Sequence, residues 1–224
     1  MVLRAQNGDD PRRRSALDQL CRTYWRPVYA YLRRKGFSPD DAEDRTQGFF
    51  LHFLEKDLVD RAHRARGRFK SYLLATLEHY LANEARLAGA LKRGGGRPTI
   101  SINRAEAEVE LRIEPFHRET PESAFERSWT LTLLENTFAA LKREFRERGL
   151  PGHFDVVRAF LAAGGARPSY EELARRLRCS TGDVTNLLHR ARKQLQELIR
   201  SGLRDTLEEE QEIDAEIRYF SRSL

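Results

Sequence analysis

The stretch that most constrains the fold is SYEELARRLRCSTGDVTNLLHRARKQL, residues 169–195, where a helical pattern of apolar residues is interrupted once. Leu173 and Leu177 stand one helical turn apart, and the pattern resumes at Val184 after a short gap. A short helix followed so closely by a longer one favours a motif in which the two helices pack across a tight turn.

Capping signals predict the ends of both helices. Ser169 can cap the first helix, and Glu172 completes a capping box three residues later, so this helix is expected to end near Leu177. Ser180 can cap a second helix over about residues 181–200. The segment is therefore expected to be a helix-turn-helix.

Arg178 stands in the turn, where many helix-turn-helix motifs have glycine because the backbone there is often left-handed. A side chain in that conformation costs on the order of 1 kcal/mol, which a folded context can absorb.

The second helix is expected to have one apolar and one polar face. The residues expected to point inward are Val184, Leu187, Leu188, Ala191, Leu195 and Leu198. The residues expected toward the other side are Thr181, Thr185, Asn186, His189, Arg190 and Lys193. An asparagine amide can hydrogen-bond a base edge in the major groove, and arginine or lysine can reach bases or phosphates. The alternative is an ordinary polar helix surface.

The remainder of the chain also has helical periodicity, without a convincing alternating strand, so the fold class is expected to be all-α. Three consecutive glycines and several prolines predict an extended linker between two helical domains. The expected divisions are a first domain (1–93), the linker (94–123), a second domain (124–203) and an acidic C-terminal tail (204–224).

The charged residues favour a nucleic-acid partner. The formal net charge is +6, and much of it comes from arginine, whose guanidinium matches phosphate geometry. The alternative explanation is a high-GC genome, which encodes arginine wherever a cation is tolerated. No metal-ligand spacing of histidine and cysteine occurs, and no glycine-rich loop follows a strand, so no catalytic, metal or cofactor site is expected.

Membrane and export signals are also not expected. The longest apolar runs are too short for a membrane span, and the basic N-terminal stretch precedes no apolar signal region. Cys21 and Cys179 are expected to be buried thiols in a reducing compartment, so we expect a cytoplasmic location and no membrane partner.

Three segments together resemble the bacterial sigma-70 family of RNA polymerase sigma factors, of the extracytoplasmic-function (ECF) type. They are PVYAYLRRKGFSPDDAEDRTQGFFLHFLEK, FKSYLLATLEHYLANEARLAGALKRGG and the later V-x-x-x-L-H-R-A-R-K-x-L. The resemblance covers most of residues 15–200. It implies a helical region 2 that binds the clamp helices of the largest polymerase subunit and melts the −10 promoter element. It also implies a region 4 that binds the flap of the second-largest subunit and the −35 element.

The resemblance implies a set of contacts in region 2. Core polymerase would be bound by Asp41, Glu43, Asp44, Gln47 and Phe50. The acidic members of this set would alternatively serve to complement the helix dipole. The −10 DNA would be bound by Arg61, His63, Arg64, Arg66, Arg68, Lys70, Tyr72, His79, Asn83 and Arg86. A core role for Tyr72 is equally open, because tryptophan is usual there in the family.

The −35 contacts implied by region 4 are the polar residues given above for the second helix. The family commonly has lysine, serine and arginine where this chain has Thr185, Asn186 and Leu187, which lowers the expected affinity for phosphate. Core RNA polymerase and promoter DNA are the expected partners, and an anti-sigma factor or other regulator is a further candidate. A helix-turn-helix regulator that acts without being a polymerase subunit is the alternative function.

Overall fold

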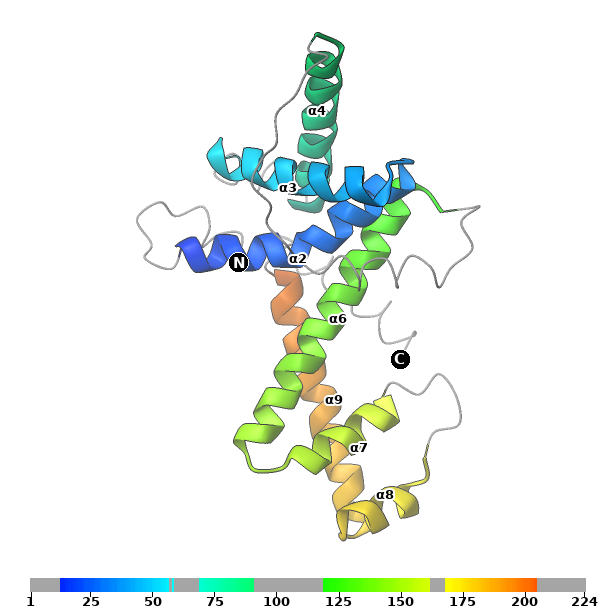
Figure 1. The fold of residues 1–224 in the computed structure, drawn as a ribbon. Helices are drawn as coiled ribbons and strands as arrows, with labels where there is room; N and C mark the ends of the chain where they lie inside the picture. Colours follow the sequence, from blue (N-terminus) through cyan, green and yellow to red (C-terminus); the bar gives the residue numbers. More distant parts are fainter. Residues whose placement is uncertain (1–12, 57, 59–68, 91–118, 162–167, 205–224) are drawn as a thin grey trace. The chain divides into compact units, whose positions relative to one another are not determined.

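The structure of the chain is a computed structural model that describes residues 13–56, 58, 69–90, 119–161 and 168–204 (Figure 1). Across these residues it contains seven helices and no strand, which confirms the expected all-α class. The chain divides into two compact units, Met1–Thr132 and Leu133–Leu224.

One helix contributes to both units. The first unit contains α2 (Arg13–Arg34), α3 (Pro39–Glu55), α4 (Phe69–Ala90) and the first half of α6 (Pro121–Glu147). The second unit contains the rest of α6 with α7 (Pro151–Leu161), α8 (Tyr170–Leu177) and α9 (Thr181–Arg204). None of the described helices combines the length and the apolarity needed to cross a membrane.

A tight turn joins α2 to α3 in the first unit. Gly36 has φ +97°, a left-handed conformation that glycine adopts without a side-chain clash. Ser38 caps α3, because the Asp41 amide donates a hydrogen bond of 3.1 Å to the Ser38 hydroxyl. Pro39 occupies the first helical position.

The core of the first unit is largely aromatic. The ring centroids of Tyr24 and Phe69 lie 5.3 Å apart, and those of Phe49 and Tyr80 lie 5.8 Å apart. Gly48 permits the close approach of α3 to α4, since a Cβ atom at this position would overlap the Tyr80 hydroxyl. These contacts fix α4 against the helix that precedes it.

The first half of α6 also packs into this unit. Thr120 caps the helix by accepting a hydrogen bond of 3.1 Å from the Ser123 amide. Phe125 and Trp129 are buried, and the Phe125 ring stacks on Tyr24 with a centroid distance of 6.3 Å. This part of α6 is therefore a core element of the first unit.

The division observed between the units differs from the predicted domain boundaries. Residues 94–118 of the predicted linker and residues 205–224 of the tail lie outside the described residues. Residues 121–123, predicted in the linker, are helical, and residues 124–132, predicted in the second domain, belong to the first unit. Pro121 indicated a linker by composition, yet proline also suits the first turn of a helix.

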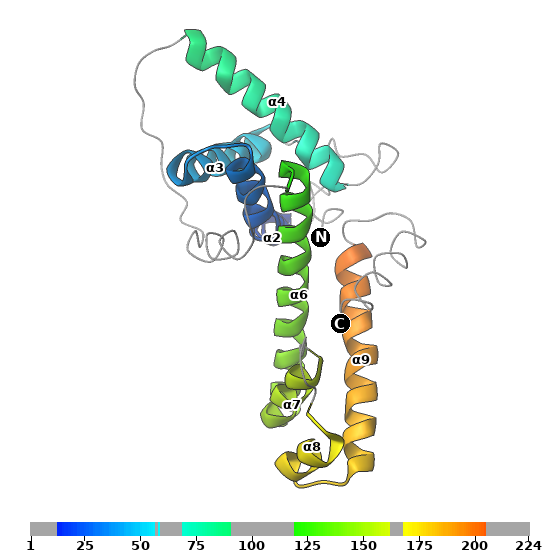
Figure 2. The same cartoon turned by 90° about the vertical axis from the view of Figure 1, so that its right-hand side faces the viewer.

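The second unit is built around α9. Figures 1 and 2 both show α7 and α8 beside the N-terminal part of α9. Its core is extended by Phe145 of α6 and Phe154 of α7, whose ring centroids lie 6.4 Å apart. The buried residues of α9 are Val184, Leu188, Ala191, Leu195, Ile199 and Leu203.

The predicted inner face of α9 needs a small correction. Leu187 and Leu198 are half-buried rather than buried, whereas Ile199 and Leu203 are buried. Steps of three and four residues from Val184 lead to Ile199 and Leu203, so Leu187 and Leu198 stand at the edge of the apolar stripe.

Candidate nucleic-acid interface

The turn between α8 and α9 has the left-handed residue that the sequence predicted. Arg178 has φ 53° and ψ 44°, and it is the only described non-glycine residue with positive φ. The Cys179 amide donates a hydrogen bond of 3.1 Å to the Ala174 carbonyl, which satisfies the end of α8. Ser169 caps α8 as predicted, accepting from the Glu172 amide at 3.2 Å. The helix-turn-helix is confirmed as a structural motif.

The start of α9 is fixed by a reciprocal cap. The Asp183 amide donates to the Ser180 hydroxyl at 3.1 Å, and the Ser180 amide donates to the Asp183 carboxylate at 3.0 Å. Hydrogen bonds from the Ser180 hydroxyl and then its amide hold the pKa of the Asp183 carboxyl below its ordinary value. The sequence predicted the Ser180 cap but not the part taken by Asp183.

All six polar residues predicted for the −35 contact are exposed along one side of α9. We call this set the α9 face, and it consists of Thr181, Thr185, Asn186, His189, Arg190 and Lys193. Two of its side chains bond to the helix itself: the Thr185 hydroxyl donates to the Thr181 carbonyl at 3.0 Å, and Arg190 Nε donates to the Asn186 carbonyl at 3.3 Å. The opposite side of α9 is anchored in the core, so the α9 face is held on a fixed helix.

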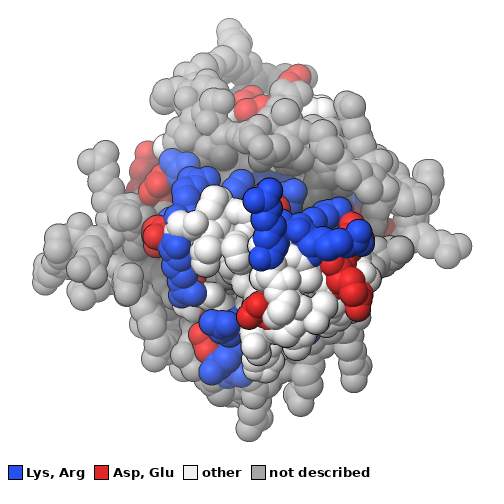
Figure 3. Space-filling model, turned by 90° about the horizontal axis from the view of Figure 1, so that it is seen from below, with Lys and Arg blue, Asp and Glu red and all other residues white. Residues whose placement is uncertain are grey.

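Basic side chains surround the end of the second unit that contains α8 and the turn into α9. Figure 3 shows Lys and Arg side chains around a largely uncharged centre, with fewer Asp and Glu side chains among them. Arg175 of α8 and Arg178 of the turn are exposed. Arg176 is also exposed, and its guanidinium donates to Glu172 at 2.8 Å. Such a surface favours an anionic partner.

The residues predicted for −10 DNA have three different outcomes. Arg61, His63, Arg64, Arg66 and Arg68 lie outside the described residues. His79, Asn83 and Arg86 are exposed on α4, at spacings of four and three residues that place them on one face. Arg86 Nη2 donates to Asn83 Oδ1 at 2.6 Å, so these two side chains are already oriented together.

Lys70 is buried in the first unit, and Tyr72 is half-buried there. The Tyr72 ring lies 6.4 Å from Phe53 and from Phe69 between centroids, and its hydroxyl donates to the Leu58 carbonyl at 2.7 Å. Lys70 is only 2% exposed, and its ammonium donates to Glu126 at 2.5 Å. Its ammonium is therefore not available to DNA in this structure, because α6 covers it.

The residues predicted to bind polymerase are divided between the surface and the core. Asp41 and Asp44 are exposed and Glu43 is half-buried. Gln47 and Phe50 are buried, with 7% and 4% of their surface exposed. These two face inward because the same side of α3 carries its core phenylalanines. Only the acidic residues of this set are placed to contact a partner.

No family model, curated protein or solved structure matched the chain. What the α9 face can bind is inferred from its own side chains. Hydroxyl, amide, imidazole and cationic groups can all donate hydrogen bonds to base edges or phosphate oxygens.

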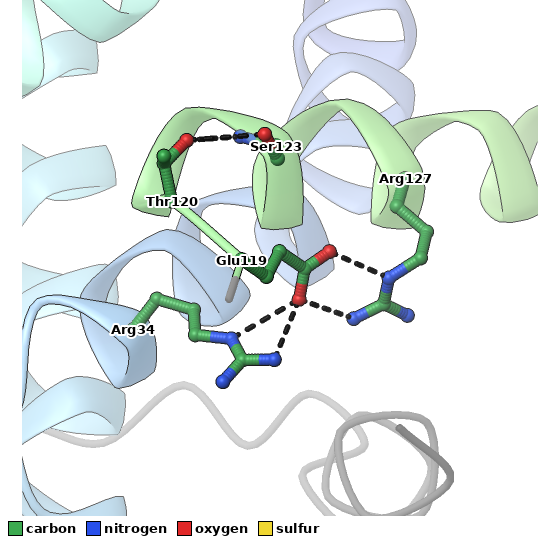
Figure 4. A network of polar contacts seen from close by, with 5 residues as sticks. All are labelled: Arg34, Glu119, Thr120, Ser123 and Arg127. Atoms are coloured by element: carbon green, nitrogen blue, oxygen red, sulfur yellow. Dashed lines mark hydrogen bonds and ion pairs between the residues drawn. The ribbon is translucent and has the colours of Figure 1, made fainter. Parts of the chain in front are cut away.

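Sequence reasoning missed a polar network in the first unit, shown in Figure 4. Arg34 of α2 and Arg127 of α6 both point toward the Glu119 carboxylate. Their hydrogen bonds, led by that from Arg127, lower the pKa of Glu119. No local pattern signals this network, because Arg34 and Glu119 are 85 residues apart.

A second cluster was also missed. Tyr31 of α2 and Lys35, the residue that follows α2, both donate hydrogen bonds to Glu78 of α4. Burial and the bond to Glu78 raise the pKa of Tyr31, whereas the bonds from Lys35 and then Tyr31 lower the pKa of Glu78. These hydrogen bonds link α2 and the residue after it to α4.

Proposed function

We propose that this chain is an alternative sigma factor of the bacterial sigma-70 family, ECF type. It joins core RNA polymerase, recognises the −35 element with its second unit and melts the −10 element with its first. The observation that carries the proposal is the α8–α9 helix-turn-helix, in which six exposed polar side chains share one face of a helix whose other face is buried. The resemblance of region 2 and region 4 segments supplies the link to polymerase.

The proposed −35 contact follows from the placement of side chains on the α9 face. Asn186 reads a base edge, since a carboxamide can both donate to and accept from adenine in the major groove. Arg190 and Lys193, one turn and two turns further along the helix, reach bases or phosphates. Thr181 lies at the start of α9, where the helix dipole and backbone amides favour a phosphate.

The proposed −10 contact uses the exposed side of α4. His79, Asn83 and Arg86 follow the basic segment 56–68 and offer hydrogen-bond donors to an unpaired strand. Asp41 and Asp44 on α3 provide an acidic surface for a basic partner on polymerase. In this proposal Lys70, Tyr72, Gln47 and Phe50 support these surfaces from within rather than touching the partner.

Transcription in vitro tests the proposal. The protein is added to core polymerase with genomic promoter fragments, and transcripts and −35 footprints are measured for the unaltered chain and for Asn186→Ala. We expect promoter-specific transcripts from the unaltered chain and a loss of −35 selectivity of about 5- to 100-fold in the variant. Gln196→Ala, an exposed neutral change further along α9, is the matched control.

Two results would count against this assignment. An unchanged −35 footprint with Asn186→Ala would remove the proposed groove contact. Promoter binding without any dependence on polymerase would favour a helix-turn-helix regulator instead.

A further inference from the structure

We infer that residues 119–132, which are the first part of α6 and the two residues before it, dock on a surface made by α2 and α4. We call this segment the docking helix. This contact, rather than the covalent segment 91–118, holds the chain before that segment and the chain after it together. The docking helix carries its own contacts with the first unit and continues beyond Thr132 into the second unit. A chain cut within 91–118 should therefore stay assembled. All contacts that carry this inference lie within the first unit.

The apolar part of the contact consists of fully buried side chains. Ala124 and Phe125 are 0% exposed and Trp129 is 2% exposed. Phe125 stacks on Tyr24 of α2 with an interplanar angle of 24°. Aromatic side chains of this size supply most of the affinity at protein interfaces, because each removes a large apolar area from water.

A buried lysine adds specificity to this surface. Lys70 of α4 points at the docking helix, with its Nζ atom 3.8 Å from the centroid of the Trp129 ring and 2.5 Å from Glu126 Oε2. Lysine is almost never this deeply buried unless its charge is paired. Both groups that accommodate the charge come from the docking helix, so the burial of Lys70 depends on docking.

A second ion pair fixes the start of the docking helix. The Arg34 side chain is 4% exposed and donates to Glu119 Oε2 from Nη2 at 2.7 Å and from Nε at 3.1 Å. Arg127 donates to Glu119 Oε1 at 2.9 Å, which holds the carboxylate in the orientation that Arg34 requires (Figure 4). One ion pair joins the docking helix to Arg34 of α2 and the other joins it to Lys70 of α4. The docking helix is therefore bound to both helices that make the surface.

Because of these contacts, the segment that the sequence predicted as a linker between domains connects two parts of the same unit. The helix before it, α4, and Glu119 after it both belong to the first unit. The covalent passage to the second unit lies inside α6, between Thr132 and Leu133. Cutting within 91–118 turns the docking into an association between two separate fragments. The effective concentration that the covalent link provides, on the order of millimolar, is then lost. None of the contacts above is removed.

The test is made on the full chain without DNA or polymerase. A protease recognition sequence is inserted after Gly95, the folded protein is cleaved to completion, and the two fragments are followed by size-exclusion chromatography at roughly micromolar concentration. A denaturing gel confirms that cleavage is complete. We expect the fragments to elute together, and separate elution would overturn the inference. The result does not depend on the proposed function, which is tested only with polymerase and DNA.

Variants then test whether the named contacts hold the fragments together. In the cleaved protein, Trp129→Ala should weaken the association by about 100-fold or more. Glu126→Gln leaves a buried ammonium without its carboxylate and should weaken it by about 10-fold or more. Glu147→Gln, the same change at an exposed position of the same helix, should have no effect.

The comparison remains informative if Trp129→Ala does not fold. Circular dichroism of the uncut variant detects that case, and the matched pair at 126 and 147 then supplies the result. Equal association of Glu126→Gln and Glu147→Gln would show that the Lys70 contact does not hold the docking helix, and the inference would fail.

Discussion

Replacement of Arg178 by glycine should stabilise the helix-turn-helix, although it removes a side chain. The Arg178 backbone is left-handed, at φ 53° and ψ 44°, which costs an L-residue roughly 1–2 kcal/mol relative to glycine. Glycine loses roughly 0.5–1 kcal/mol more through the entropy of the unfolded chain. The net expectation is a local gain of about 0.5–1 kcal/mol in the free energy of unfolding.

Native-state hydrogen exchange measures this gain where it arises. The Cys179 and Val184 amides donate to the Ala174 and Ser180 carbonyls, so their exchange reports on the opening of the turn. Arg178→Gly should slow their exchange by about two- to fivefold.

A matched substitution in α8 gives the opposite expectation. Arg175→Gly, an exposed change within the helix, should speed the same exchange, because glycine costs about 1 kcal/mol in a helix interior. If Arg178→Gly destabilises the turn as much as Arg175→Gly does, the left-handed geometry and the reasoning from it are wrong.

Three other predictions concern packing, pH and DNA binding. Val184 is fully buried, and Val184→Ala should lower the free energy of unfolding of the second unit by about 2 kcal/mol in urea titrations, from two lost methyl groups and the resulting cavity. Glu119 has a lowered pKa in the folded protein, chiefly through Arg127, so its contribution to stability is present above its ordinary value of 4.5 and is lost as pH falls through the folded-state value. Glu119→Gln should therefore flatten the pH dependence of stability below about pH 4.5, measured by urea unfolding at several pH values. Lys193→Ala should reduce the slope of log affinity for DNA against log salt by about 1, whereas Arg143→Ala, an exposed change on α6, should leave the slope unchanged.

Local structure was largely predictable because its signals lie within a few residues of each other. Ser169 and Ser180 each cap a helix at the predicted position, since a cap requires only a side chain and an amide two or three residues later. The left-handed turn at Arg178 was expected because many helix-turn-helix motifs have glycine at this position of the turn. The α9 face followed from the helical period alone.

Contacts between distant segments were not predictable in this way. Lys70 and Glu126 are 56 residues apart, and no pattern around Lys70 distinguishes a lysine beneath a tryptophan from one that meets phosphate. Gln47 and Phe50 were assigned to a partner surface by the family resemblance, but the packing of α3 places them inward. Composition predicted a linker up to residue 123, whereas the helix begins at Pro121 and docks on residues far away in the sequence.

The most direct test of the proposed function is assembly with core RNA polymerase. The purified chain and core enzyme are mixed and separated by size-exclusion chromatography, and the complex is then tested for transcription from a promoter pool. We predict a stable one-to-one complex that initiates at promoters which core enzyme alone does not use. A chain that binds promoter DNA but never enters the complex, and adds no transcripts, would contradict the account.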